Sequence, residues 1–213
     1  MAKTKKLKTS NRFYIVAHKL VARGVLRLFR VQIEGAENLP AVGGYIYCSN
    51  HICALDPIMV CGAGRTQVHY MAKKELFKIP LLSTLIRALG AFPVNRGGAD
   101  VGAIRRAIEL LQAGESVGIF IQGHRYRGVP LRETKPKNGA VMIAVRSGAP
   151  ILPICIKTPG NRFSMFKRTR LIIGKPIAVS DLGLDEHASG EFSRASQEVF
   201  DEICRLEESI ADA

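Results

Sequence analysis

The sequence predicts an α/β fold, a three-layer α/β/α sandwich around a mostly parallel central sheet. From Gly43 onward, short apolar runs bounded by turn residues alternate with amphipathic helical patterns. The apolar runs are continuous, which is typical of strands that are buried on both faces. With 213 residues, 47% of them hydrophobic, the chain is long enough for one such domain and too short for two of ordinary size.

The predicted elements follow from the period of the apolar residues. The strands are predicted at 45–49, 68–71, 117–121, 151–156 and 171–173. The helices are predicted at 58–63, 81–89, 101–113, 138–147 and 192–210, the last with its acidic residues facing water. Strands that are separated by helices pair mostly in parallel, and such sheets bind ligands at the carboxyl ends of their strands. Residues that follow a strand are therefore the first candidates for a site.

Charge divides the chain into two parts. The 31 Lys and Arg residues against 18 Asp and Glu give a formal net charge of +13, which favours anionic partners such as nucleic acid, acidic lipid or phosphorylated substrates. No acidic residue precedes Glu34, and residues 11–30 place apolar and basic stripes on a helical period. Residues 1–40 are therefore predicted to be a basic amphipathic membrane-associating segment, and residues 41–213 the domain that carries the chemistry. A helix that packs on the domain and solvates its charges is the alternative.

Composition narrows the class of protein further. Nucleic-acid modules usually add stacking aromatic residues to a basic surface, whereas aromatic residues here make up 7% and Trp is absent. We therefore expect no nucleic acid as a partner, and a non-enzymatic binder of anionic lipid or nucleic acid remains the alternative. The five cysteines form no CxxC pair, so a disulfide framework or a zinc ribbon is not indicated. Without a long apolar stretch or a signal cleavage site, we expect a protein that is neither exported nor membrane-spanning.

The segment CSNHICALDP at 48–57 carries the candidate chemistry. On one regular helix, His51 and Asp56 would point about 140° apart and could not touch. Pro57 favours the first helical position and keeps Asp56 out of the helix, which predicts Asp56 as an N-cap that folds back towards His51. A carboxylate on one imidazole nitrogen leaves the other free to accept a proton from a hydroxyl, as in general-base acyl transfer without a protein nucleophile.

Plainer interpretations of this segment stay open. Asp56 can serve only as a helix cap, and a single histidine near a strand end is often structural. Cys53 as a covalent nucleophile and a metal site of His51, Cys53 and His124 are both conceivable, but a buried cysteine commonly fills a core and metal sites usually show clearer ligand clusters. We predict no metal.

The segment resembles the NHxxxxDP motif of the glycerolipid acyltransferases, specifically the bacterial 1-acylglycerol-3-phosphate acyltransferase (PlsC) family. Its residues are Asn50, His51, Asp56 and Pro57. Three further blocks are similar to the family's later motifs in the same order: GAFPVNR at 90–96, FIQGHR at 120–125 and APILPI at 149–154. Lys73 and Lys74 match a stretch between the first two motifs, so the resemblance spans about half of the chain.

The resemblance implies the binding residues. Arg96 and Arg125 are predicted as the phosphate pair, because a guanidinium donates two hydrogen bonds in a geometry that fits a phosphate, and Lys73 is a third candidate. The predicted substrate-binding residues also include Asn50, Gln122, Gly123 and His124. The family usually has Glu-Gly-Thr-Arg where this chain has Gln122 to Arg125, which leaves the acceptor headgroup open. Pro150 and Pro153 of the fourth block are expected to bend a strand edge and to shape an apolar wall.

The resemblance also implies the reaction. We expect acyl transfer from acyl-CoA or acyl-carrier protein to the free sn-2 hydroxyl of 1-acylglycerol-3-phosphate, giving phosphatidic acid, with His51 as general base and Asp56 as its support. The acyl donor is a cosubstrate, and no cofactor is expected. A different lysophospholipid or amphipathic acceptor is the alternative. The expected location is the cytoplasmic face of the cell membrane, as a peripheral or monotopic protein on an anionic surface. Acyl length, donor type and oligomeric state do not follow from the sequence.

Overall fold

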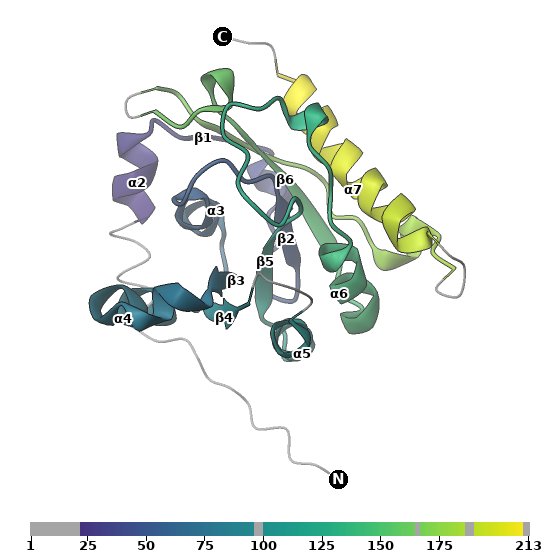
Figure 1. Ribbon diagram of the computed structural model, residues 1–213. Helices are drawn as coiled ribbons and strands as arrows, with labels where there is room; N and C mark the ends of the chain where they lie inside the picture. Colours follow the sequence, from purple (N-terminus) through teal and green to yellow (C-terminus); the bar gives the residue numbers. More distant parts are fainter. Residues whose placement is uncertain (1–21, 96–99, 165–166, 186–189, 211–213) are drawn as a thin grey trace.

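The computed structural model describes residues 22–95, 100–164, 167–185 and 190–210 (Figure 1). The strands are β1 (Gln32–Glu34), β2 (Ile46–Ser49), β3 (Val68–Lys73), β4 (Phe92–Val94), β5 (Ser116–Phe120), β6 (Ile151–Lys157) and β7 (Arg170–Ile173). The α-helices are α2 (Arg23–Leu28), α3 (Asp56–Ala63), α4 (Pro80–Ala88), α5 (Val101–Gln112), α6 (Gly139–Ser147) and α7 (Glu191–Glu208). Short 3₁₀ helices are η2 (Ala36–Asn38), η3 (Lys74–Lys78), η4 (Leu131–Glu133), η5 (Pro159–Asn161) and η6 (Val179–Leu182).

The strands form one sheet in the order β1-β7-β6-β2-β5-β3-β4. All neighbouring strands pair in parallel except β6 and β7, which are antiparallel. The mostly parallel sheet is therefore confirmed. β2 lies in its interior, between β5 and β6, so the residues that follow it emerge near the middle of the sheet. This is the position at which open α/β sheets usually bind ligands.

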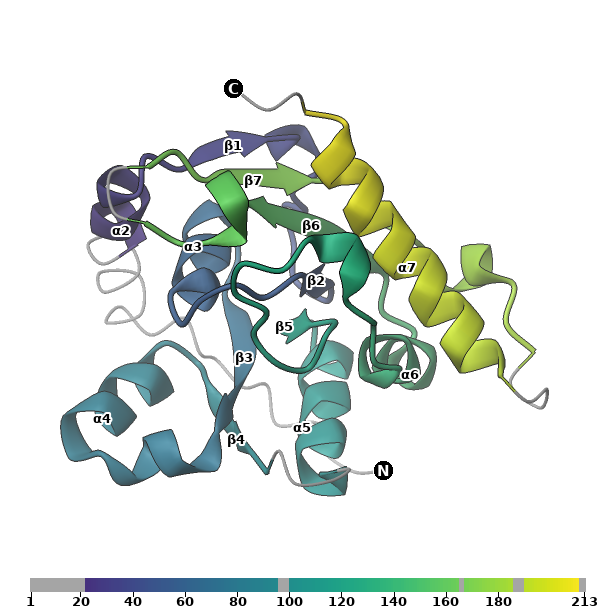
Figure 2. The ribbon, with the colours of Figure 1, turned by 45° about the horizontal axis from the view of Figure 1, so that its top comes forward.

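Helices lie on both faces of the sheet (Figure 2), and a hydrophobic cluster under each layer of helices makes the fold a three-layer sandwich. Helices α5, α6 and α7 cover one face, with residues such as Ala107, Val141 and Val199 fully buried. On the other face, Met59 of α3 and Tyr47 of β2 are fully buried, and α2 packs against α3. The predicted fold class is confirmed.

The N-terminal region differs from the prediction. β1 pairs in parallel with β7, although the predicted boundary at residue 40 places Gln32–Glu34 in the N-terminal segment. The strand has three residues at the edge of the sheet and only one apolar side chain, so it gives no periodic signal. Of the predicted amphipathic helix at 11–30, the structure describes α2, and residues 11–21 lie outside the described residues.

Within the described ranges, no helix has the length and hydropathy required to cross a bilayer.

A glycine in β5, Gly118, makes room for the aromatic side chain of Tyr70 on the neighbouring strand β3. Tyr70 of β3 is the register partner of Gly118 in β5. A Cβ atom at position 118 would lie 2.2 Å from Cζ of Tyr70, which is far inside van der Waals contact. The tyrosine ring therefore lies over the glycine, and from there it stacks on Phe120 with a centroid distance of 5.3 Å. Only glycine at position 118 allows this arrangement.

We predict that Gly118→Ala lowers the free energy of unfolding by about 1–3 kcal/mol, because the added methyl group displaces a buried ring. Gly139→Ala is the matched control, since no atom lies within 4 Å of its Cβ position and alanine suits the helix α6 better. This control should leave stability unchanged or raise it by up to about 1 kcal/mol. Urea denaturation of both variants measures the difference. Equal stability of the two variants would contradict the close approach of Tyr70.

Candidate active site

The loop between β2 and α3 is tied to the neighbouring strand by Asn50. The side chain of Asn50 is buried and donates from Nδ2 to the carbonyl oxygen of Ile156, at 2.9 Å. The amide of Ile156 donates to Oδ1 of Asn50, at 2.7 Å. Asn50 thus continues the hydrogen bonding between β2 and β6 by one more pair. Both ends of its amide are engaged with the backbone, so the contacts of Asn50 described here are structural, and its role in substrate binding stays a prediction.

Asp56 gathers the loop around its carboxylate. Its Oδ2 atom accepts hydrogen bonds from the backbone amides of Ile52 at 2.6 Å and Cys53 at 2.8 Å. The same atom lies 2.7 Å from Nδ1 of His51, so the predicted contact between His51 and Asp56 is confirmed. The predicted N-cap is wrong in detail, because the helix begins at Asp56 and its residue before the first turn, Leu55, offers no side-chain cap. The carboxylate turns back to the loop, where its Oδ2 atom contacts the amides of Ile52 and Cys53 and the imidazole of His51 at the same time.

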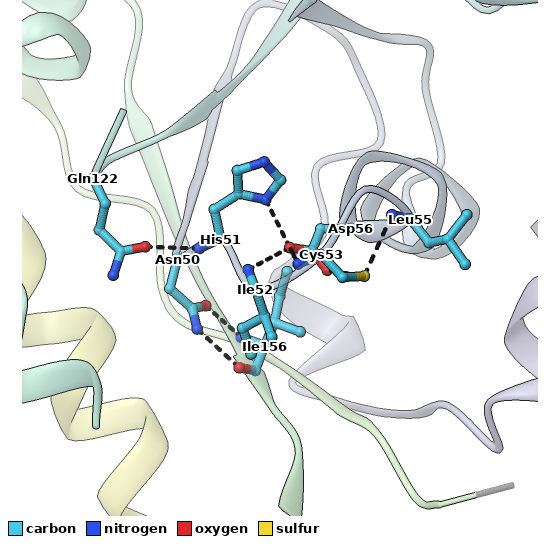
Figure 3. A network of polar contacts seen from close by, with 8 residues as sticks. All are labelled: Asn50, His51, Ile52, Cys53, Leu55, Asp56, Gln122 and Ile156. Atoms are coloured by element: carbon cyan, nitrogen blue, oxygen red, sulfur yellow. Dashed lines mark hydrogen bonds and ion pairs between the residues drawn. The ribbon is translucent and has the colours of Figure 1, made fainter. Parts of the chain in front are cut away.

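The imidazole of His51 is fixed on several sides (Figure 3). A carboxylate only accepts hydrogen bonds, so Nδ1 carries the proton in its contact with Asp56, and in the neutral imidazole Nε2 is then the acceptor. One face of the ring stacks on Phe120, with centroids 3.8 Å apart and planes 10° from parallel. The backbone amide of His51 donates to Gln122, and its carbonyl accepts from the amide of Tyr126. In Figure 3 the second ring nitrogen faces away from Asp56.

His51 borders a cavity of about 440 Å³. Most of the cavity wall is apolar and comes from the loop before α3, from β3 and from α4, with Leu82, Leu85, Ile86 and Leu89 on the α4 side. The cationic residues at its border are Lys73 and Arg125. The cavity therefore combines an acceptor nitrogen, positive charge and a long apolar wall, which suits an amphipathic anionic molecule.

The third block contributes Arg125 to this cavity through a tight turn. Gly123 has φ of 74°, a conformation that favours glycine, and its amide donates to the carbonyl of Phe120. Arg125 is exposed, and no carboxylate among the described residues pairs with it. Lys73 pairs with the exposed Glu75 at 3.8 Å. The ring of His124 instead rests against Tyr126, and His124 does not border the cavity.

The predicted phosphate residue Arg96 lies outside the described residues, as do Gly97 and Gly98. The structure therefore brings His51, Asp56, Lys73 and Arg125 to one site, and leaves the position of Arg96 undescribed.

A profile of the family described as Acyltransferase matches residues 30–157, the region that contains the loop, the cavity and the turn. The chain belongs to the acyltransferase family. Its predicted resemblance is thereby confirmed, and the enzyme class with it.

Named relatives of this acyltransferase agree with the family match. A 1-acyl-sn-glycerol-3-phosphate acyltransferase of Bacillus subtilis is 38% identical over 156 residues, which cover 71% of this chain and 75% of that protein. The enzyme of the same name from Borreliella burgdorferi is 31% identical, covering 63% of this chain and 54% of its own length. The crystal structure of the 1-acyl-sn-glycerophosphate (LPA) acyltransferase PlsC from Thermotoga maritima matches with a TM-score of 0.68 at 25% identity, over 98% of this chain and 87% of that one.

Gln122 of this acyltransferase supports the loop from behind. Its side chain is 1% exposed and does not border the cavity. Oε1 accepts from the amide of His51 at 2.8 Å, and Nε2 donates to Oγ1 of Thr134 at 2.7 Å. The hydroxyl of Thr134 in turn donates to the carbonyl of Leu131. Through these contacts Gln122 positions the backbone of His51, and its role in acceptor binding stays a prediction.

The hydrogen bonds of this network suit an amide at position 122, where the family usually has a glutamate. The single hydrogen of the Thr134 hydroxyl is given to Leu131, so Oγ1 faces Gln122 as an acceptor. An amide supplies the N–H that this acceptor needs, and a carboxylate does not. Gln122 and Thr134 are therefore matched to each other in the support of His51.

Cys53 contacts Asp56 and is not poised as a nucleophile. Its thiol donates to Oδ1 of Asp56 at 3.0 Å and accepts from the amide of Leu55. Burial, together with the negative charge of Asp56, raises the pKa of the Cys53 thiol to about 12. Thiolate is the nucleophilic form, so this environment opposes covalent catalysis by Cys53. Among the described residues, no group of three or more His, Cys, Asp or Glu side chains is arranged to hold a metal ion.

The fourth block lies away from the cavity wall. Pro150 precedes β6 and Pro153 lies within it, and β6 is an interior strand between β7 and β2. The carbonyl of Pro153 accepts from the amide of Gly174, and the carbonyl of Pro150 accepts from that of Ile46. Neither proline borders the cavity, so the expected edge position and apolar wall are both wrong. The wall comes from the segment around the start of α3, from β3 and from α4 instead.

We predict that Gln122 and Thr134 act as a coupled pair. Thr134→Val leaves the Nε2 group of Gln122 buried without an acceptor, and Gln122→Leu removes the acceptor of the His51 amide, so each should cost about 1–3 kcal/mol of stability. The double variant should lose less than the sum of the two, because the valine then faces no stranded amide. Denaturant titrations of the four proteins give the coupling free energy. Strict additivity would contradict the network.

Proposed function

We propose that this acyltransferase moves an acyl group from a thioester donor to the free sn-2 hydroxyl of 1-acylglycerol-3-phosphate, giving phosphatidic acid. The observation that carries the proposal is the contact of His51 Nδ1 with Asp56, which leaves Nε2 as a proton acceptor at the border of an apolar cavity. The names of the relatives from Bacillus subtilis and Borreliella burgdorferi support the choice of acceptor.

In the proposed step, Nε2 of His51 takes the proton of the acceptor hydroxyl as its oxygen attacks the carbonyl carbon of the thioester. The new C–O bond forms, the C–S bond breaks, and the departing thiolate takes the proton from His51. Asp56 stabilises the transient positive charge of the imidazole and keeps its orientation. A thioester is a reactive acyl donor, so proton removal and orientation are the main contributions required of the protein.

The cavity supports an acceptor with a phosphate at one end and a chain at the other. The exposed guanidinium of Arg125 has the donors for a bidentate contact with a phosphate, and Lys73 adds a second positive charge at the cavity border. We propose Arg96 as the second member of the phosphate pair on the basis of the family resemblance. The apolar wall from α4 suits an acyl chain.

The donor is proposed to be a cosubstrate, either acyl-CoA or acyl-carrier protein, and no resident cofactor enters the proposed step. The working location is proposed to be the cytoplasmic face of the cell membrane, where the basic segment at 1–40 binds anionic lipid. Acyl transfer measured with each donor type and a panel of lysolipids tests the acceptor and the donor together. Transfer to neither 1-acylglycerol-3-phosphate nor a related lysolipid would refute the proposal.

We predict that His51→Ala lowers kcat by about 10²–10⁴-fold, the usual contribution of a general base. Cys53→Ala, in the same loop, should keep kcat within about tenfold, because the proposed step forms no bond to sulfur. Steady-state assays with 1-acylglycerol-3-phosphate and acyl-CoA or acyl-carrier protein compare the two variants, with thermal unfolding as a check on folding. Full turnover by His51→Ala would refute the proposed role of His51, and complete loss in a folded Cys53→Ala variant would favour covalent catalysis.

We predict that Arg125→Ala raises the KM for the acceptor by about 10–100-fold, the loss expected for a charge-assisted contact with phosphate. His124→Ala is the neighbouring control, since this side chain lies outside the cavity border and should leave KM unchanged. The acceptor dependence of the initial rate, measured for both variants, separates the two residues. A larger effect at His124 than at Arg125 would reverse the assignment of the phosphate contact.

A further inference from the structure

The segment formed by η3 and α4 presents its apolar side chains to the outside. No described side chain between Met71 and Arg87 is buried. Leu81 is 89% exposed and Ile79 is 50% exposed, and Leu76 and Leu85 are each 37% exposed. These four residues are called the α4 surface below. In Figure 2 the segment stands out from the sheet, with β4 as the strand nearest to it.

The α4 surface is a cluster, which distinguishes it from the scattered apolar residues of any protein surface. It contains four of the eight large hydrophobic side chains that are exposed among the described residues. Leu81 and Leu85 lie four positions apart on α4 and therefore share one helix face. Single exposed apolar residues are ordinary, whereas a contiguous patch usually marks a surface that is covered by a partner or a membrane.

Positive charge accompanies the α4 surface. Lys74 and Lys78 of η3 are exposed, and the guanidinium of Arg87 lies over the ring of Phe77, with Cζ 4.8 Å from its centroid. Glu75 is the one acidic residue between positions 71 and 90 of the sequence, and it pairs with Lys73. Apolar side chains interleaved with cations are complementary to an anionic lipid surface. The apolar side chains enter the acyl region, and the cations contact the anionic headgroups.

Other occupants fit less well by charge. Residues 1–21 of the same chain contain five lysines and one arginine but no acidic residue, so Lys74, Lys78 and Arg87 would repel them. A second copy that presents its own α4 surface would bring the same cations face to face. An anionic bilayer meets neither repulsion.

We propose that the α4 surface inserts into the headgroup region of an anionic membrane. The same helix then separates the bilayer from the cavity, because Leu85 belongs to the α4 surface and also borders the cavity beside Leu82 and Ile86. An amphipathic acceptor reaches His51 from the lipid along this helix, without passing through water. This access route rests on the proposed function, whereas the membrane contact itself does not.

The chain contains no Trp, so one introduced Trp reports on its own surroundings. Leu81→Trp in the full chain places the probe on the α4 surface, at a residue that does not border the cavity. Val42→Trp is the matched control, since Val42 is 67% exposed and lies between η2 and β2. With vesicles of phosphatidylglycerol and phosphatidylcholine, only the probe at 81 should shift its emission to shorter wavelength and be quenched by brominated acyl chains.

Several results would overturn the proposal. An unshifted probe at 81, with or without cosedimentation of the protein, means that α4 does not enter the lipid. A shift that depends on protein concentration in the absence of vesicles means that a second copy covers the surface. Equal shifts at 81 and 42 mean that the contact is not specific to α4.

A double variant gives an independent measurement. Ile79→Asp with Leu81→Glu places acidic residues at the N-cap and first turn of α4, where they suit the helix, but opposes insertion into an anionic surface. Vesicle affinity should fall by about tenfold or more, while transfer to a short-chain acceptor in detergent is retained. Unchanged vesicle affinity would overturn the membrane contact. Absence of transfer by the wild-type protein would instead refute the proposed function and leave the vesicle result readable.

Discussion

The candidate site depends on one carboxylate, that of Asp56. It is fully buried, and it is compensated by two backbone amides, the thiol of Cys53 and the imidazole of His51. Burial of a carboxylate is costly unless donors surround it, so the loop has to close around this group for the fold to be stable. The same closure fixes the tautomer and the direction of the imidazole. The contacts of the Asp56 carboxylate therefore both stabilise the loop and orient the proposed base.

Residues of three neighbouring strands, β6, β5 and β3, also hold the His51 loop in place, directly or through one another. Asn50 joins the loop to β6, Gln122 reaches it from the end of β5, and the ring of Phe120 lies against the imidazole. Tyr70 of β3 completes the stack by lying over Gly118. Because β2 is an interior strand, supports arrive from both of its sides. The proposed base is thus held by the rigid part of the sheet, and the contacts with substrate are left to the more exposed side chains at the cavity border.

The sheet and α4 contribute different parts of the site. The sheet holds the polar side chains around His51, and α4 supplies apolar side chains to the cavity. The residues that form hydrogen bonds with the His51 loop are buried, whereas part of the cavity wall comes from a helix whose outer side is exposed. In the proposed membrane contact, one helix with an inner side towards the cavity and an apolar outer side gives a short path between the lipid and the proposed base. The basic residues near α4 and the basic N-terminal segment point to the same kind of partner, an anionic surface.

Local signals in the sequence determined much of this protein. The alternation of apolar runs and helical patterns was enough for the mostly parallel three-layer fold, because a strand buried on both faces cannot be polar. The pairing of His51 with Asp56 followed from the spacing and from Pro57, since the two residues are close in the sequence. The tertiary structure decided the contacts that join distant parts of the chain. Asn50 and Gln122 are bonded to Ile156 and Thr134, and no local pattern in the sequence indicates such partners. The exposure of the apolar face of α4 could not be predicted from the sequence either, because periodicity predicts an apolar side of a helix but not whether the rest of the protein covers that side.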